Sequence, residues 1–258
     1  DTDNTPVQET GVFLLTDCNV KRVYMRVIRI NKFLEEEDNI QWLVESLLPN
    51  VGWTLFYGLR GLGKTTFAMQ MCDALQRGVP FLGRKTVQTP ILYVQADSVT
   101  AEWRQMLSRI TPEGNDGFTA IDVPAQCLST PEYVVRLVEY VQTFKPGFVV
   151  FDSLYRLTRE SINTEKIQVA VNIMNDICMG KPWLVIHHPP HSESRAAGHH
   201  SLGGTCSNEW SLLKTKLKIE KGRLVQEKEL LLSRNEHGLW IPYKRGSTID
   251  GLYDREML

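Results

Sequence analysis

A glycine-rich run that ends in a lysine and two threonines is the part of this sequence best suited to chemistry. Its spacing matches the phosphate-binding pattern G-x-x-x-x-G-K-[ST], in which backbone N–H groups surround a polyphosphate. The lysine would reach the β- and γ-phosphate oxygens, and the first threonine would place its hydroxyl on Mg²⁺. We therefore expect ATP and Mg²⁺ to bind here. The run consists of Gly58, Leu59, Arg60, Gly61, Leu62, Gly63, Lys64, Thr65 and Thr66.

The residues on either side of this loop have the pattern that such a loop requires. Residues 53–57 are apolar and aromatic, which predicts a buried strand entering the loop. Apolar residues then recur at helical spacing from Phe67 to Leu75, and Gly78 offers a C-terminal stop. A strand, a glycine loop and a helix therefore follow one another in the expected order.

Asp152 is the candidate second ligand of the metal ion. It ends the apolar run at residues 148–151, which predicts a buried strand. In ATPases with a phosphate loop, such an aspartate holds Mg²⁺ beside the loop threonine, here Thr65. The alternative is an aspartate that caps a turn or helix.

Asp97 is the candidate that activates the attacking water. It follows the apolar strand predicted at residues 91–94. Hydrolysis needs a base or an orienting group for water, and a carboxylate at the tip of a strand neighbouring the phosphate loop can supply it. The alternative is an N-cap for the helix that begins near residues 98–100.

A third predicted strand, at residues 183–186, ends in His187 and His188. One of these histidines could contact the γ-phosphate or relay its loss to the next loop. Side chains alternate along a strand, so only one should face the nucleotide, and we expect His188. The alternative is a solvated strand end.

Composition sets broad limits on the class of protein. The chain has 258 residues, 42% of them hydrophobic and 23% charged, and a net charge of −1, as in ordinary soluble domains. This charge gives no overall attraction to nucleic acid, so any such contact needs a local patch. No apolar run has the length of a membrane span. The five scattered cysteines show no metal or redox spacing, which favours a reducing cytoplasm, and we expect Cys72 and Cys178 to be buried and inert.

The alternation of apolar strands and amphipathic helices predicts an α/β fold with a mainly parallel, twisted sheet flanked by helices. We expect an N-terminal extension at residues 1–30, with a hairpin formed by the stretches 12–15 and 20–30. It could be the tail of a preceding domain. The ATPase domain would span 31–258, with a short helix or turn at 40–49 leading into its first core strand.

The pattern changes after about residue 189. Residues 189–209 are polar, with several glycines, serines and histidines, and predict a long loop. Strands predicted at 211–220, 224–232 and 239–243 would form a β-rich C-terminal edge of the sheet.

The order of phosphate loop, carboxylate strand, aspartate strand and histidine strand resembles the RecA-like ATPases. It is most similar to the hexameric replicative-helicase branch, of the RepA and DnaB type, and to its AAA_25-like relatives. The lead-in at residues 41–49 and the segment 78–83 share this likeness, which covers about residues 30–245. The family usually has Glu where this chain has Asp97, and it tends to have Arg-Gly-Ser where this chain has residues 200–205.

This resemblance implies an ATP hydrolase that acts on single-stranded DNA as a homo-oligomer, most commonly a hexameric ring. A primase or other replication domain could be fused to it or associated with it. The family completes each active site with a Lys-x-Arg pair from the neighbouring subunit, and Lys221 and Arg223 match that pattern. Arg234 is the reserve candidate, and a charged hairpin turn is the alternative for the pair.

Two groups of residues are candidates for DNA contact. Lys214, Lys216 and Lys218 alternate with other residues, so that one strand face would carry all three, either to follow a phosphate backbone or to protect an edge strand from aggregation. By family position, the loop at 189–209 would also touch DNA. Its candidate residues are Arg195, His199 and His200.

Zinc binding and three other functions are alternatives to this interpretation. Five of the six histidines lie between residues 187 and 200, but no cysteine pair or helical histidine spacing supports zinc. A recombination or repair ATPase that forms filaments remains open, as does a nucleotide-gated scaffold with little turnover. A small-molecule kinase is less favoured, because no compact arginine-rich lid segment is visible.

Overall fold

The computed structural model describes residues 11–12, 23–24, 30–31, 41–115, 118–158, 165–188 and 199–243. The chain divides into two units, residues 1–39 and residues 40–258. In the first unit, strands β1 (Gly11–Val12) and β2 (Val23–Tyr24) pair antiparallel, in the region where the hairpin is predicted.

The second unit is built on a nine-stranded sheet with the order β13-β12-β11-β10-β5-β9-β8-β6-β7. One part of the sheet is parallel and consists of strands β10, β5, β9, β8, β6 and β7. Beyond β10 the sheet continues antiparallel through β11, β12 and β13. The strands are β5 (Trp53–Tyr57), β6 (Ile91–Gln95), β7 (Phe118–Asp122), β8 (Phe148–Asp152), β9 (Trp183–His187), β10 (Asn208–Leu212), β11 (Lys216–Gly222), β12 (Glu229–Arg234) and β13 (Trp240–Pro242).

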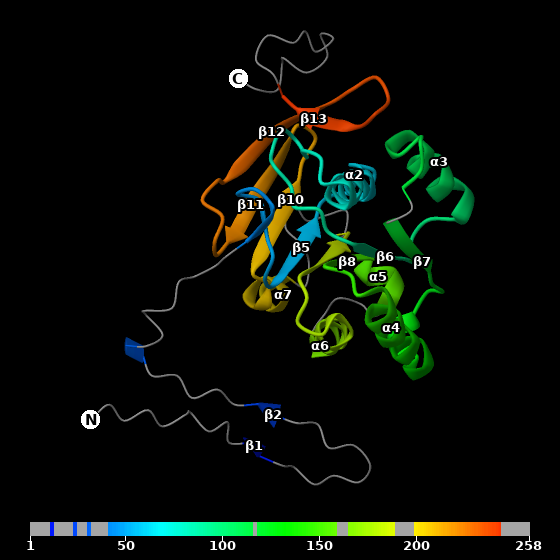
Figure 1. Ribbon diagram of the computed structural model, residues 1–258, viewed down its shortest axis with the longest axis vertical. Coiled ribbons are helices and arrows are strands. Elements are labelled where there is room, and N and C mark those ends of the chain that lie inside the picture. Colours follow the sequence, from blue (N-terminus) through cyan, green and yellow to red (C-terminus); the bar gives the residue numbers. More distant parts are fainter. Residues whose placement is uncertain are drawn as a thin grey trace. The chain divides into compact units, whose positions relative to one another are not determined.

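Helices cover both faces of this sheet (Figure 1). Helices α2 and α3 pack on one face, and α4, α5 and α6 pack on the other, each over its own buried apolar cluster. Strands β5, β6, β8 and β9 are buried along their whole length, because a parallel sheet covered on both faces has no solvated side. The helices are α2 (Lys64–Arg77), α3 (Thr100–Ile110), α4 (Pro131–Phe144), α5 (Leu154–Thr158), α6 (Glu165–Cys178) and α7 (His199–Thr205), with a 3₁₀ turn, η1, at Cys127–Ser129.

Local signals set several element ends. Gly78 adopts a left-handed conformation, with φ of 66°, and donates its N–H back to the last turn of α2, as its predicted role as a stop requires. Pro131 occupies the first turn of α4, where its missing N–H costs nothing. Cys72 and Cys178 are free and buried, as expected. No helix within the described ranges has the length and hydrophobicity needed to cross a bilayer.

Local predictions also differ from the structure. Residues 42–49, predicted as part of a short helix or turn, form a two-stranded antiparallel hairpin of β3 (Trp42–Val44) with β4 (Leu48–Pro49), with a turn at residues 45–47. The region predicted as a loop at 189–209 contains helix α7 and the start of β10. The glycine and serine content of this segment disfavours a helix. Leu202 of α7 is completely buried, and packing of this apolar side chain stabilises the helix.

Replacing a leucine at the centre of the sheet should strongly destabilise the fold. Leu184 is fully buried in β9, where it pairs with Thr54 and Val150 of the flanking strands. Leu184→Ala should lower the free energy of unfolding by about 2–5 kcal/mol, because it leaves a cavity in a packed layer. Urea denaturation followed by circular dichroism measures this, with Leu231→Ala, whose parent side chain is 50% exposed, as the matched control. Equal losses in the two variants would contradict the assigned core.

Candidate functional site

The phosphate loop joins the end of β5 to the start of α2, as predicted. The helix begins at Lys64, and Gly63 precedes it in a left-handed conformation with φ of 80°, which favours glycine. The first turn of α2 therefore presents its free N–H groups to the loop, where the helix dipole also favours an anion. This is the local geometry that a polyphosphate needs.

Lys64 is buried within the loop. Only 2% of it is exposed, and its Nζ donates hydrogen bonds to the carbonyls of Gly58 at 2.7 Å and Leu59 at 2.9 Å. Burial lowers the pKa of this ammonium to about 8, against the opposing charges of Asp152 and Asp97. A charged group desolvated in this way gains when an anion reaches it.

Asp152 ends β8 and contacts the first residues of α2. Its Oδ2 accepts hydrogen bonds from Thr65 Oγ1 at 2.8 Å and from Tyr93 Oη at 2.7 Å. Burial raises the pKa of this carboxyl, and the two hydrogen bonds partly offset the effect. Tyr93 was missed from the sequence, because its place in the middle of an apolar strand suggests only core packing.

The residues of this corner fit a magnesium ion. Asp152 is 1% exposed, and its Oδ1 accepts no hydrogen bond from the described residues. A buried carboxylate oxygen without a partner is costly unless a cation meets it. Thr65 adds a hydroxyl oxygen at the same place. Such a set of oxygen donors suits Mg²⁺.

Asp97 and His188 meet beside Asp152. His188 Nε2 lies 3.4 Å from Asp97 Oδ2, and one potential ligand atom from each of the three side chains lies within 4.8 Å of the others. The nearby His188 has the largest effect in lowering the pKa of Asp97, and the charge of Arg156 acts in the same direction, against the opposing effect of burial. The carboxylate therefore stays charged at neutral pH, as a group that orients water must.

The route by which Asp97 reaches the site differs from the prediction. Its strand, β6, does not neighbour β5, because β9 and β8 lie between them. Asp97 reaches its partners from the turn after β6, where Gln95 Oε1 accepts the N–H groups of Asp97 and Ser98. His188 follows β9, the strand directly beside β5, and its neighbour His187 is completely buried. The preference for His188 over His187 agrees with this placement.

The candidate trans pair lies away from its own phosphate loop. Gly222 pairs with Asn208, which pairs with Thr54 at the start of β5, whereas the loop follows the end of β5. Arg223 is exposed, and Lys221 Nζ donates to the carbonyls of Gly203 at 2.6 Å and Gly204 at 3.3 Å. This pair cannot serve the phosphate site of its own chain.

Arg234, the reserve finger, contacts its own phosphate loop. Its Nη2 donates a hydrogen bond of 2.6 Å to the carbonyl of Leu62. The interpretation of Arg234 as a group supplied to a neighbouring subunit is therefore corrected, because its guanidinium is bound within the chain.

The predicted basic face on β11 is only partly formed. Lys214 lies before the strand, which begins at Lys216. Lys216 and Lys218 form ion pairs of 2.9 Å with Glu229 and Glu220 respectively, which reduces their combined positive charge. The alternative of an edge strand is also wrong, since β11 pairs with β10 on one side and β12 on the other.

The remaining DNA candidates lie at or beyond the limits of the described chain. Arg195 is outside the described residues. His199 and His200 begin helix α7, but their side chains are not among those described. DNA contact by these residues stays a prediction.

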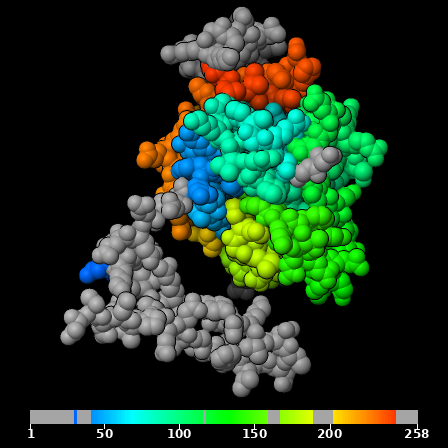
Figure 2. Space-filling model, in the orientation of Figure 1, coloured from blue at the N-terminus to red at the C-terminus, as the bar shows by residue number. Residues whose placement is uncertain are grey.

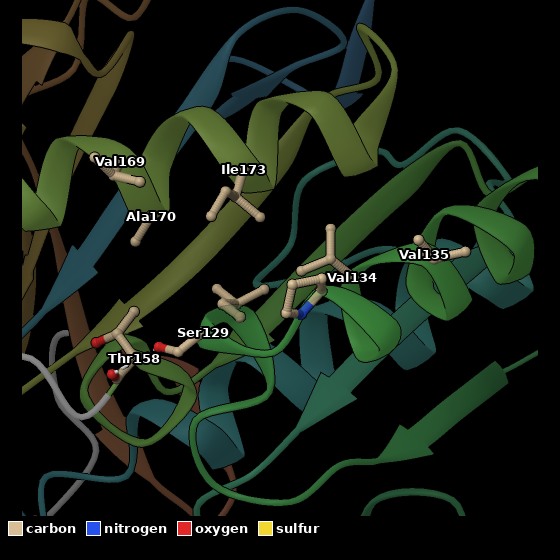
Figure 3. Close-up of a pocket in the computed structure, with 9 residues that line it drawn as sticks. Ser129, Val134, Val135, Thr158, Val169, Ala170 and Ile173 are labelled. Carbon is tan, nitrogen blue, oxygen red and sulfur yellow. Dashed lines mark hydrogen bonds between the residues drawn. The ribbon is translucent and has the colours of Figure 1, made fainter. Parts of the chain in front are cut away.

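A separate apolar pocket of about 570 Å³ lies between α4 and α6 (Figure 3). Valines of the two helices line it, and the hydroxyls at its end are already bonded: Ser129 to the carbonyl of Thr158, and Thr158 to that of Leu154. It offers apolar surface without acid–base or metal-binding groups.

The AAA_25 family model, described as an AAA domain, matches residues 21–194, about two thirds of the chain. No protein with a curated description matches. Among solved structures, the KaiC-like protein PH0186 from the hyperthermophilic archaeon Pyrococcus horikoshii OT3 aligns with a TM-score of 0.56 and 16% identity, over 78% of this chain and 94% of that one. This likeness shows the fold, and it confirms the predicted α/β RecA-like sheet.

The lowered pKa of Lys64 predicts a pH dependence of nucleotide binding. A bound polyphosphate favours the charged ammonium, so binding above the free pKa of about 8 takes up a proton. The affinity for ADP with Mg²⁺ should be steady near neutral pH and fall by up to about tenfold per unit above that pKa. Calorimetry over a pH series, in two buffers with different ionisation enthalpies, measures both the affinity and the proton uptake. Constant affinity without proton uptake would contradict the assigned burial of Lys64.

Proposed function

This chain belongs to the AAA_25 family of RecA-like P-loop ATPases, and we propose that it hydrolyses ATP with Mg²⁺ at the carboxyl ends of its parallel strands. One observation carries the proposal: Lys64, Thr65 and Asp152 meet at one corner, with Asp97 beside them. A cationic loop, an oxygen site for a metal ion and a charged carboxylate are the parts that phosphoryl transfer to water needs.

The loop residues bind and neutralise the triphosphate. Lys64 exchanges the carbonyls of Gly58 and Leu59 for phosphate oxygens, while the N–H groups at the start of α2 hold the same oxygens. Thr65 and Asp152 would hold Mg²⁺, which neutralises charge on the β- and γ-phosphates when bound. These contacts orient the γ-phosphate for attack.

Asp97 acts on the attacking water. Its pKa is lowered, chiefly by His188, so it is a weak proton acceptor and works mainly by orienting the water. His188 lies beside Asp97, where it would contact the γ-phosphate of bound ATP and could relay loss of that phosphate to the segment that follows β9. Water adds to the γ-phosphorus as the bond to the β-phosphate oxygen breaks, which yields ADP, inorganic phosphate and a proton that passes to solvent.

Removing the charge of Asp97 should slow hydrolysis without weakening binding. We expect Asp97→Asn to lower kcat by about 100-fold or more, because the water loses its orienting acceptor. The affinity for ADP with Mg²⁺ should change little. A phosphate-release assay and calorimetry measure the two effects, with Asp176→Asn on the exposed face of α6 as the control. An unchanged kcat would contradict the role of Asp97.

We further propose that the protein is a motor of the replicative-helicase type that acts on single-stranded DNA as a ring. The resemblance to this family supports the proposal. The placement of Arg223 also supports it, because Arg223 is exposed just after β11, level with the start of β5, whereas its own phosphate loop follows the end of β5. An arginine in that place can act on nucleotide only in another copy of the chain. Coupling of hydrolysis to assembly would follow.

A subunit-mixing experiment tests this arrangement. Arg223→Ala should lower turnover strongly while nucleotide affinity stays unchanged, because the finger acts in the transition state. Adding the Asp97→Asn variant should restore part of the activity, since that subunit supplies Arg223 to an intact site. Normal hydrolysis by Arg223→Ala alone would rule out the finger.

DNA dependence separates the motor from other functions. Single-stranded DNA should stimulate ATP hydrolysis, and strand displacement then distinguishes a helicase from a recombination ATPase. A nucleotide-gated scaffold is the second candidate. The short side chain of Asp97 favours it, because Arg156 Nε lies 3.9 Å and His188 Nε2 lies 3.4 Å from the oxygens of that carboxylate. Slow hydrolysis that DNA does not change, together with tight nucleotide binding, would support the scaffold and contradict the motor.

A further inference from the structure

The C-terminal hairpin formed by β12 and β13 holds two successive carbonyls of the phosphate loop. Arg234 Nη2 donates to the carbonyl of Leu62 at 2.6 Å, and Trp240 Nε1 donates to the carbonyl of Gly63 at 3.1 Å. These are the two residues that directly precede Lys64. The hairpin therefore contacts the loop at the place where its backbone must face a phosphate.

These contacts bear on the direction of the loop N–H groups. In a trans peptide unit the C=O and the N–H point in opposite directions. The carbonyl of Leu62 shares its peptide unit with the N–H of Gly63, and the carbonyl of Gly63 shares its unit with the N–H of Lys64. With both carbonyls directed to the hairpin, both N–H groups point away from it, free to receive phosphate oxygens.

The hairpin is itself held in place. The Arg234 guanidinium lies 4.2 Å above the Trp240 ring, and its Nη1 donates to the carbonyl of Gly238 at 3.0 Å. Gln70 of α2 pairs with the backbone of Trp240 through two hydrogen bonds, of 2.8 and 3.2 Å. Figure 2 shows the orange and red residues of the hairpin against the cyan segment that contains α2.

Gly63 completes this contact from the side of the loop. A Cβ atom added there would overlap the Arg234 guanidinium, in addition to the strain of its positive φ. The close approach of arginine and loop therefore requires a residue without a side chain. The loop and the hairpin fit each other as a pair.

We propose that Arg234 and Trp240 are positioning residues that preorganise the phosphate loop of their own chain for nucleotide. The proposal rests on the proposed binding of ATP at this loop. Without the Arg234 contact, the peptide unit that joins Leu62 and Gly63 would lose the hydrogen bond to its carbonyl. The Gly63 carbonyl also accepts the N–H of Phe67 at 2.9 Å, so without Trp240 it would keep only this helical hydrogen bond. Nucleotide would then have to order the loop further on binding. The cost would appear in affinity for the phosphates.

Trp240→Phe tests the proposal, because it keeps an aromatic ring under Arg234 and removes only the indole N–H. We expect the Kd for ADP with Mg²⁺ to rise about fivefold to tenfold, the effect of one hydrogen bond. Arg234→Lys should have a similar effect, since an ammonium cannot span the carbonyls of Leu62 and Gly238 as the guanidinium does. The KM for ATP should rise with the Kd, while kcat changes by less than about twofold.

Trp183→Phe is the matched control. Trp183 Nε1 also makes a hydrogen bond of 3.0 Å, to Asn175, but at the start of β9, the opposite end of the sheet from the loop. Both tryptophan variants should lower the melting temperature, and only Trp240→Phe should weaken nucleotide binding. This difference separates positioning of the loop from general stability.

The outcomes distinguish this inference from the proposed function. Wild-type protein that binds no nucleotide would contradict ATP binding itself. If the wild type binds nucleotide and the variants Trp240→Phe and Arg234→Lys bind it with equal affinity, only the role of the hairpin is contradicted. Equal weakening by Trp183→Phe and Trp240→Phe would also overturn it, because the loss would then reflect stability.

Discussion

Two opposite charges buried at one corner of the sheet set the constraint on which the rest of the structure depends. The Lys64 ammonium and the Asp152 carboxylate are both almost completely buried, and their pKa values are shifted toward the neutral forms by that burial. Buried charges of this kind cost free energy unless partners compensate them. Phosphate oxygens and a divalent cation are the partners that match these two groups.

The parallel sheet makes this corner possible. Strands β5 and β8 end at the same edge of the sheet, and β9 lies between them, so that His188 follows β9 and lies beside Asp97. Helix α2 covers one face, and the antiparallel strands beyond β10 bring Arg234 and Trp240 back to the loop. The site is therefore assembled from the ends of strands far apart in the chain, and an apolar cluster on each face of the sheet holds those strands in place.

The elements defined by local chemistry could be predicted from the sequence. The phosphate loop, its strand and helix, the end of α2 at Gly78 and the start of α4 at Pro131 follow from glycine, proline and apolar spacing. The elements that depend on distant contacts could not. Helix α7 depends on packing of Leu202. The separation of β6 from β5 by β9 and β8 depends on how strands distant in sequence pair with one another. Arg234 was only the reserve candidate for a group supplied to another subunit, because no spacing reveals a contact with a carbonyl 172 residues away.

The account is tested most directly by titrating the purified protein with ADP in a calorimeter, once with Mg²⁺ and once with excess chelator. A site built from Lys64, Thr65 and Asp152 predicts binding of one nucleotide per chain, clearly tighter when Mg²⁺ is present. Folded protein that takes up no ADP under either condition would contradict the central claim, and affinity that Mg²⁺ does not change would contradict the metal site at Asp152.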